Sequence, residues 1–331
     1  MKQSLIIREA RAEDNEALLA LDRQCSMGEG ALLSFDRAPD FFARSRPYEQ
    51  FQFFVAEAEG AVVGVGGAAI KRLRIKGEWL KAAYFYDLRV DPAYRRMGVA
   101  SAIGGALRDF ARKEAVELGY SLIAEGNISS LQFVAKRGSQ PVRRCMLTVL
   151  SAHSPDVEGR GAWRPLAEED VDQVSSLIER GFQDHDLVPS FDAITLKGLM
   201  RRAPGLSFQD LYGLEAEGRL VACFGLWDYS GIMRISVRGA GEVSPYFLLP
   251  LAFEAPALLA EVIHQTRRLL AERQCDRTVP ALFIPYDPED STFAPLRGFG
   301  GLELPIYLFA LPIREGLVLG KNPLYLDPLD L

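Results

Sequence analysis

The sequence predicts an α/β protein built from two similar halves, and three observations support this. The chain has 331 residues, 48% hydrophobic and 25% charged, which is the composition of globular protein long enough for two domains of about 150 residues each. Segments with strand-like alternation are followed by segments with apolar residues at helical spacing. The same order of segments then occurs a second time along the chain.

The repeat is clearest in two pairs of segments. Residues 6–25 hold an arginine, an acidic pair and a helical pattern, and residues 163–182 echo them. Residues 51–69 hold two strands joined at Glu59-Gly60, and residues 210–228 echo them with a second Glu-Gly turn. The expected division is a first domain at 1–150, a small polar linker at 151–162, a second domain at 163–311, and a tail at 312–331 that lies against the body as coil.

The elements of the first half follow from its local patterns. The expected strands are 4–11, 51–75 as a hairpin, 78–90, 120–126 and 141–150, and the expected helices are 12–25, 39–48, one that ends at Gly119, and 127–138 closed by Gly138. The glycine-rich run from Gly64 to Gly67 continues into a strand, so it predicts no dinucleotide site. The basic run from Lys71 to Lys76 is expected on a solvated hairpin face, with substrate steering as the alternative.

The formal net charge of −6 is unevenly distributed. Residues 1–150 hold 22 Lys and Arg against 18 Asp and Glu, whereas residues 151–331 hold 16 against 26. The first half therefore suits an anionic ligand, and the second half suits solvent or a cationic partner. Neither half is basic enough to indicate nucleic-acid binding.

The chain carries no membrane, export or metal signal. No apolar run approaches the roughly 20 residues that cross a bilayer, and the first residues turn acidic too early for a signal peptide. We therefore expect a cytoplasmic protein without membrane contact. The cysteines are scattered at Cys25, Cys145, Cys223 and Cys275, which predicts free thiols and neither a disulfide framework nor a metal site.

The segment from Tyr84 to Ser101 carries the clearest chemistry. A strand leads into a short loop with Arg95, Gly98 and Ala100, and the loop opens a helix. Small residues let the backbone approach a ligand closely, and the free N–H groups of a helix start favour an anion. Arg95 and Arg96 add charge-assisted hydrogen bonds to phosphate. The segment therefore predicts a pyrophosphate site.

At these residues the chain resembles the GNAT acetyltransferases, whose loop pattern is Arg/Gln-x-x-Gly-x-Gly/Ala. The pattern here is Arg95-Arg96-Met97-Gly98-Val99-Ala100, preceded by the run from Leu88 to Pro92 and followed, after a strand, by a helix from Asn127 to Gly138. The element order of residues 4–149 also matches. The resemblance implies two tandem GNAT-like domains, each with a mixed, mostly antiparallel central sheet flanked by helices.

The resemblance also implies acetyl-CoA as co-substrate in a cleft between strand 78–90 and strand 120–126. The backbone of Leu88 and Val90 would bond the pantetheine arm, loop amides would bind the pyrophosphate, and Asn127 and Phe133 would line the thiol end. The implied cofactor-binding residues are Leu88, Arg89, Val90, Arg95, Arg96, Met97, Gly98, Val99, Ala100, Ser101, Asn127 and Phe133.

An amine that attacks a thioester must lose a proton. An alkylamine has a pKa near 10.4, so its deprotonation at pH 7 costs about 4.6 kcal/mol, and a base or a water chain should lie near the acetyl group. Asp87 is the first candidate, with Tyr86 and Glu125 as alternatives; Asp87 can instead orient a loop or bind the substrate's cation. Many family members carry a tyrosine general acid seven residues after the helix-opening asparagine, where this chain has Val134.

The second half has no phosphate loop. The corresponding stretch, from Gly241 to Pro256, lacks a Gly-x-small pair before the helix. We expect a degenerate GNAT-like domain that shapes the acceptor cleft or a homodimer. The expected activity is acetylation of a small-molecule or peptide amine. Because the second half is acidic, it would favour an acceptor that carries positive charge. Two alternatives are a non-catalytic acyl-CoA sensor and an acyltransferase for a longer acyl chain.

Overall fold

The structure is a computed structural model that describes residues 5–25, 33–152, 161–239, 241–273 and 278–331. Its strands form one sheet: β1 Leu5–Glu9, β2 Leu33–Asp36, β3 Gln50–Ala58, β4 Ala61–Ile75, β5 Glu78–Val90, β6 Leu118–Ala124, β7 Gln140–Ser151, β8 Trp163–Pro165, β9 Val188–Pro189, β10 Leu211–Ala216, β11 Arg219–Asp228, β12 Arg234–Val237, β13 Gly241–Phe253, β14 Val279–Tyr286 and β15 Leu302–Pro312. The α-helices are α1 Asn15–Gln24, α2 Val99–Lys113, α3 Ile128–Ala135, α4 Val171–Gly181, α5 Ala193–Arg202 and α6 Pro256–Glu272.

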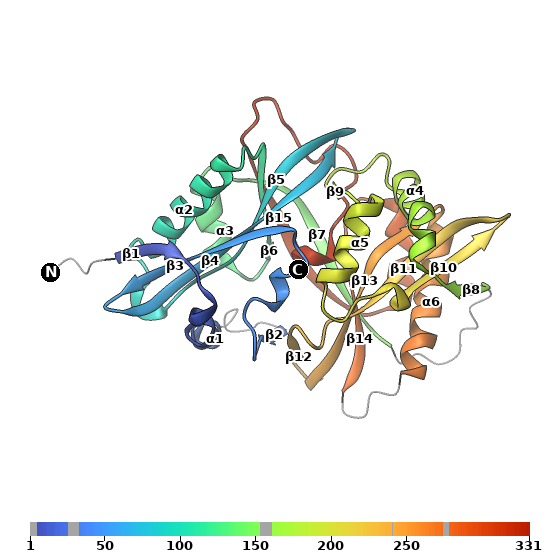
Figure 1. The fold of residues 1–331 in the computed structure, drawn as a ribbon, viewed down its shortest axis with the longest axis horizontal. Coiled ribbons are helices and arrows are strands. Elements are labelled where there is room, and N and C mark those ends of the chain that lie inside the picture. Colours follow the sequence, from blue (N-terminus) through green and yellow to red (C-terminus); the bar gives the residue numbers. More distant parts are fainter. Residues whose placement is uncertain (1–4, 26–32, 153–160, 240, 274–277) are drawn as a thin grey trace.

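The two halves share this sheet by exchanging their last strands. The strand order is β1-β3-β4-β5-β6-β15-β7-β14-β13-β11-β10-β8. Strand β15 of the second half therefore lies between β6 and β7 of the first half, and β7 pairs antiparallel with β14 of the second half. Both halves have the same order of elements. Strands β1, β3, β4, β5 and β6 of the first half correspond to β8, β10, β11, β13 and β14 of the second. Figure 1 shows the first half on the left, the second on the right, and the end of the chain between them.

Helices α1 and α2 cover opposite faces of the first half's sheet. Leu18 and Leu21 of α1 pack in one buried cluster with Tyr84 and Tyr86 of β5. Ile103 of α2 packs in another cluster, against which Phe85 of β5 lies. Because successive side chains of a strand point to opposite faces, residues 84 and 86 face α1 and residue 85 faces α2. The α1 face is called the acceptor face below.

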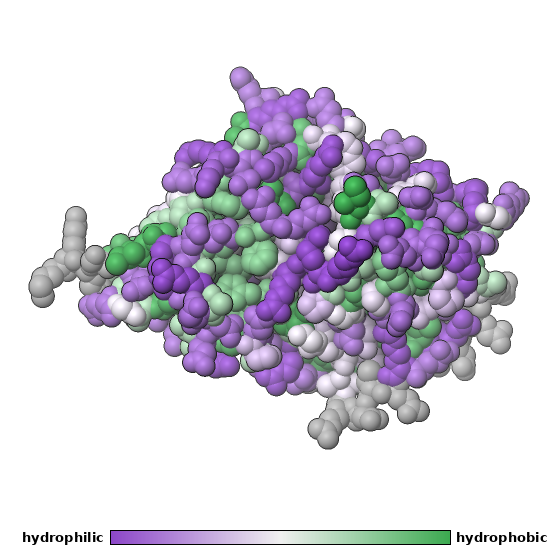
Figure 2. Space-filling view, in the orientation of Figure 1, coloured by the Kyte–Doolittle hydropathy of each residue, from purple (hydrophilic) through white to green (hydrophobic). Residues whose placement is uncertain are grey.

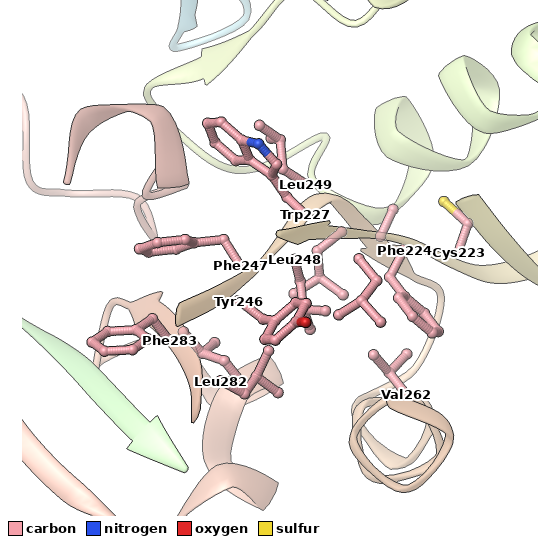
Figure 3. Packing of buried hydrophobic residues seen from close by; sticks show 14 of the residues in the cluster. Cys223, Phe224, Trp227, Tyr246, Phe247, Leu248, Leu249, Val262, Leu282 and Phe283 are labelled. Carbon is pink, nitrogen blue, oxygen red and sulfur yellow. The ribbon is translucent and has the colours of Figure 1, made fainter. Parts of the chain in front are cut away.

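The second half has the larger core. Trp227, Phe247 and Phe283 belong to one buried cluster with many aliphatic residues, and Figure 3 shows their rings on the side of the strands away from Val262 of α6. Hydrophilic side chains cover most of the face drawn in Figure 2. In the part of the chain that the structure describes, no helix has the length and apolarity needed to span a bilayer.

Several expected boundaries change. Helix α2 ends at Lys113, and Gly119 lies within β6, so the prediction that Gly119 ends this helix was wrong. Within residues 39–48 the structure has only a short 3-10 helix at Ala43–Ser45. Most of the expected linker, 153–160, lies outside the described residues, and β7 runs to Ser151. The hairpin turn at Glu59-Gly60 and the strand through Gly64–Gly67 are confirmed.

The basic run of β4 is not a solvated face. Lys71 is buried, and its ammonium lies 2.7 Å from Asp327 and 2.8 Å from Asp330 of the C-terminal tail. The tail is coil up to a 3-10 helix at Pro328–Asp330, and Leu324 to Leu326 are buried. The neighbouring Arg72 is exposed, so the prediction of a solvated run holds there and was wrong at Lys71.

Candidate functional site

Strands β5 and β6 form a fork that opens a gap in the sheet. They pair in parallel only from Ala82–Tyr84 to Leu118–Tyr120, although β5 continues to Val90 and β6 to Ala124. Beyond this point each strand keeps its outer neighbour, β4 or β15. The inner edges therefore present backbone N–H and C=O groups that a bound ligand can pair with, as an added strand would.

The loop between β5 and α2 lies at the open end of this fork. Asp91 accepts a 2.8 Å hydrogen bond from the amide of Ala93 and starts a 3-10 turn at Pro92–Tyr94. Arg96 and Gly98 have φ of +65° and +86°, so the loop doubles back into the first turn of α2. Arg95, Arg96, Met97 and Gly98 are exposed, and nothing lies within 4 Å of a side chain built at Gly98. The loop thus offers free amides at a helix N-terminus to an anion.

Helix α3 adds a cation to this end of the fork. Asn127 caps it by accepting a 3.2 Å hydrogen bond from the amide of Ser130. The guanidinium of Arg137, just after the helix, lies 3.6 Å from the ring centre of Phe133 and 2.5 Å from the hydroxyl of Ser101 in α2. Burial lowers the pKa of Arg137, and the nearby positive charge of Arg108 lowers it further.

Helix α3 is apolar and yet has no buried residue. Ile128 is 57% exposed, and Leu131, Phe133 and Val134 are only half-buried. A helix of this composition normally buries its apolar face against the protein. Together with the exposed Met97 of the loop, this face is suited to cover a ligand that has an anionic end and an apolar arm.

The second half has the same framework without the binding features. In β13, Leu249 and Pro250 form a bulge opposite Gly225 of β11. In β5, Asp87 and Leu88 form the same kind of bulge opposite Gly66 of β4. Pro250 thus stands where Leu88 stands, and proline has no N–H to give a ligand. Only residues 254 and 255 separate β13 from α6, whereas residues 91–98 separate β5 from α2.

The space beyond the paired part of β13 and β14 is also lined by the tail. Leu248 and Ile284 of the sheet lie there with Leu324 and Tyr325. The ring of Tyr325 packs 4.9 Å from that of Phe182 after α4. An apolar segment of the chain's own sequence thus lies where a fork in this half would have to receive a ligand.

Asp87 lies at the centre of a buried ion-pair cluster on the acceptor face. Its carboxylate is 2.5 Å from Arg37, 3.1 Å from Arg44 and 3.0 Å from Arg89. Burial alone would raise the pKa of Asp87, but these three guanidinium groups hold it well below its usual range. Asp87 therefore stays ionised near neutral pH and is a poor acceptor for an amine's proton.

The alternative bases are in unsuitable surroundings as well. Burial raises the pKa of Tyr86, whose hydroxyl hydrogen-bonds to Ser45 at 2.9 Å, so this phenol stays protonated. Glu125 forms an ion pair of 2.8 Å with Arg144 and accepts a hydrogen bond from Tyr307 at 3.1 Å, which lowers its pKa. Neither group provides a carboxylate or phenolate poised near pH 7.

The sequence patterns did not predict a second buried polar cluster, which lies at the closed end of the fork. Tyr84 and Tyr120, the last paired residues, donate hydrogen bonds to the carbonyl and the carboxylate of Asp330, the latter at 2.7 Å. Tyr48 donates to the same carboxylate at 3.0 Å, and Lys71 completes the cluster. The only local signal was the placement of Asp327 and Asp330 in the otherwise apolar end of the tail, residues 323–331.

Comparisons with known proteins agree with this geometry. Residues 16–138 match the acetyltransferase (GNAT) family. The chain is 25% identical over 311 residues to acetyl transferase GW6a of Oryza sativa subsp. japonica, which covers 88% of this chain and 67% of that protein.

Two solved structures share the fold. Saccharomyces cerevisiae N-myristoyltransferase with bound myristoyl-CoA superposes with a TM-score of 0.69 at 13% identity over 93% of this chain and 79% of the yeast chain. A GCN5-related N-acetyltransferase from Sphaerobacter thermophilus superposes with a TM-score of 0.64 at 15% identity over 96% and 98%. At these identities the likeness concerns the fold.

Proposed function

We propose that this chain, whose residues 16–138 match the acetyltransferase (GNAT) family, is an acyl-CoA acyltransferase that transfers acetyl from acetyl-CoA to an amine. The observation that carries the proposal is the fork between β5 and β6 with the Arg95–Ala100 loop at its open end. The pyrophosphate would bind the loop amides, Arg95 and Arg96. The pantetheine arm would pair with the inner edge of β5 at Leu88 and Val90 and lie under α3; in the structure the carbonyl of Val90 accepts hydrogen bonds from Cys25 and Arg95, which the arm would replace.

The reaction needs few protein groups because a thioester is already activated. The amine nitrogen attacks the thioester carbon, the C–S bond breaks, and the CoA thiolate takes up a proton while the new amide loses one. Backbone N–H groups at the bulge of β5 would stabilise the oxyanion. Since Asp87, Tyr86 and Glu125 are poor bases, the amine's proton would leave through water. The CoA thiolate would take its proton from water, because this chain has no tyrosine at 134 and the buried Tyr84, whose pKa is raised by burial, donates its hydroxyl to the carbonyl of Asp330.

The closed end of the fork favours a short acyl group. Tyr84 and Tyr86 stack with ring centres 5.2 Å apart, and Tyr120 lies 5.2 Å from Tyr84. All three are buried, so their rings occupy the space beyond the fork on the acceptor face. A long acyl chain would have to displace them. The fold shared with the yeast N-myristoyltransferase keeps the longer-acyl alternative worth testing.

The acceptor face is built by both halves, which supports a role for the second half in acceptor binding. Strand β2 pairs with β12, Arg234 forms an ion pair with Asp36, and the tail reaches Tyr84. The acceptor is proposed to be a small-molecule or peptide amine that enters from this face.

Calorimetry with acetyl-CoA and a panel of amines assayed for thiol release test the proposal. Gly98→Glu should abolish acetyl-CoA binding because it places a carboxylate where the pyrophosphate binds. Gly77→Glu is the matched control, since Gly77 has a similar φ of +79° and open surroundings at the far hairpin turn. Equal affinity of both folded variants would refute the site. Binding without thiol release for any amine would favour the sensor alternative, and faster turnover of long-chain acyl-CoA would favour the longer-acyl one.

A further inference from the structure

Asp87 connects the edge of β5 that faces the fork with the acceptor face. We propose that Asp87, held by Arg37 and Arg44, is a positioning residue that fixes the bulge of β5 and so aims the amide of Leu88 into the fork; this rests on the proposed acyl transfer. The bulge lies between the pairs Gly67–Tyr86 and Val65–Arg89, so that Asp87 and Leu88 together oppose Gly66.

The bulge needs to be held because its backbone is strained. Asp87 has φ of +55°, a left-handed conformation that a side-chain-bearing residue keeps only where its surroundings impose it. Aspartate tolerates this region better than most residues. The opposite strand leaves no room for adjustment, because a side chain at Gly66 would come within 2.8 Å of Ile103 in α2. The bulge is therefore confined on the α2 side and tethered on the acceptor side.

The contacts that hold the bulge on the acceptor side are ion pairs, and they are almost completely buried. The side chains of Arg37, Arg44 and Asp87 are 4%, 7% and 5% exposed. Arg37 follows β2 and Arg44 lies in the 3-10 helix Ala43–Ser45, so both come from the segment that covers the acceptor face. Asp22 of α1 pairs with Arg89 at 2.5 Å and stands 3.8 Å from Arg37. Charge-assisted hydrogen bonds in such a setting are short and directional, and they fix geometry well.

The arrangement gives a role to a carboxylate that is a poor base and yet lies beside the proposed reaction centre. An amide misplaced by about 1 Å can cost 100-fold in rate. If the clamp sets the direction of the Leu88 amide, its loss should lower kcat far more than it weakens acetyl-CoA, whose affinity comes mostly from the phosphate loop. A catalytic base at Asp87 would behave differently, because its loss would also change the pH profile.

The test compares two variants at this position in the full-length protein. Asp87→Ala removes the carboxylate and disfavours φ of +55°. Asp87→Asn combined with Arg44→Gln removes one charge of each sign, keeps an oxygen for Arg37 and Arg89, and keeps a side chain that tolerates the left-handed region. Asp170→Ala breaks a more exposed aspartate–arginine pair, Asp170 with Arg164, in the second half and serves as control. The readouts are kcat and KM from pH 6 to 9, acetyl-CoA affinity by calorimetry, and amide hydrogen exchange at residues 87–90.

We expect Asp87→Ala to lower kcat about 100-fold with acetyl-CoA affinity within about threefold, and to speed exchange at the Leu88 amide. The charge-matched pair should recover at least about a tenth of wild-type kcat with an unchanged pH profile, and Asp170→Ala should match wild type. Two results would refute the proposal. One is that the double variant Asp87→Asn with Arg44→Gln is as inactive as Asp87→Ala and loses one limb of the pH profile. The other is that Asp87→Ala keeps both the kcat and the amide exchange of the wild type. If Asp87→Ala does not fold, the pair carries the test. Absence of transfer by the wild type would refute the proposed function, and the exchange comparison would still decide the clamp.

Discussion

Lys71 and Asp330 are 259 residues apart in sequence, and their charged groups lie 2.8 Å apart in the interior. Asp327 lies 2.7 Å from the same ammonium, so one cation faces two carboxylates there. The phenols of Tyr48 and Tyr120 each donate a hydrogen bond to one carboxylate oxygen of Asp330. This cluster ties the tail to the closed end of the fork.

Removal of the Lys71 ammonium should therefore lower the free energy of unfolding much more than removal of a surface charge. Lys71→Met leaves two buried carboxylates without a counterion, and breaking a buried pair in this way costs about 3–5 kcal/mol. Arg72→Met, at the exposed neighbour in the same strand, should change the free energy of unfolding by less than about 1 kcal/mol. Urea denaturation at pH 7 measures both. Equal stability of the two variants would show that the tail is not held by this cluster.

The ion pairs of Asp87 should contribute a pH-dependent stability of definite sign. Its folded pKa lies well below the unfolded value near 3.9, so the stabilisation is complete above about pH 5 and is lost as pH falls through the unfolded value towards the folded one. Asp87→Asn cannot titrate. The free energy of unfolding of the wild type should therefore fall more steeply between pH 5 and pH 3 than that of the variant, as followed by urea denaturation. Parallel curves would contradict the low pKa of this carboxyl.

The sequence predicted the parts of the site whose cause is local. The loop at Gly98, the cap at Asn127 and the hairpin turn at Gly60 each depend on residues within one turn, and all three have the expected backbone. The burial of Lys71 could not be predicted, because its partners lie at the other end of the chain and the run around it resembles a solvated strand. The environment of Asp87 was hidden for the same reason, since Arg37 and Arg44 reach it across the acceptor face.

The number of cofactors per chain distinguishes the halves. The second half has Pro250 at the bulge, a two-residue connection before α6, and tail residues in the space beyond β13 and β14. Calorimetry should thus give one acetyl-CoA per chain, and Gly98→Glu should remove all binding. A stoichiometry of two, or residual binding in Gly98→Glu, would locate a site in the second half.

The exchange of strands β7 and β15 predicts that neither half is stable alone. In residues 1–152 the edges of β6 and β7 would both be open, because β15 normally fills the gap between them with pairs to each. Unpaired edges of this length are templates for aggregation. We expect residues 1–152 and 161–331 to be insoluble when expressed separately, and to form a soluble complex of one copy each when expressed together, since each supplies the strand that the other lacks. Gel filtration with an acetyl-CoA binding measurement tests this. A soluble, monomeric first half that binds acetyl-CoA as tightly as the full chain would show that β15 is dispensable for the fork.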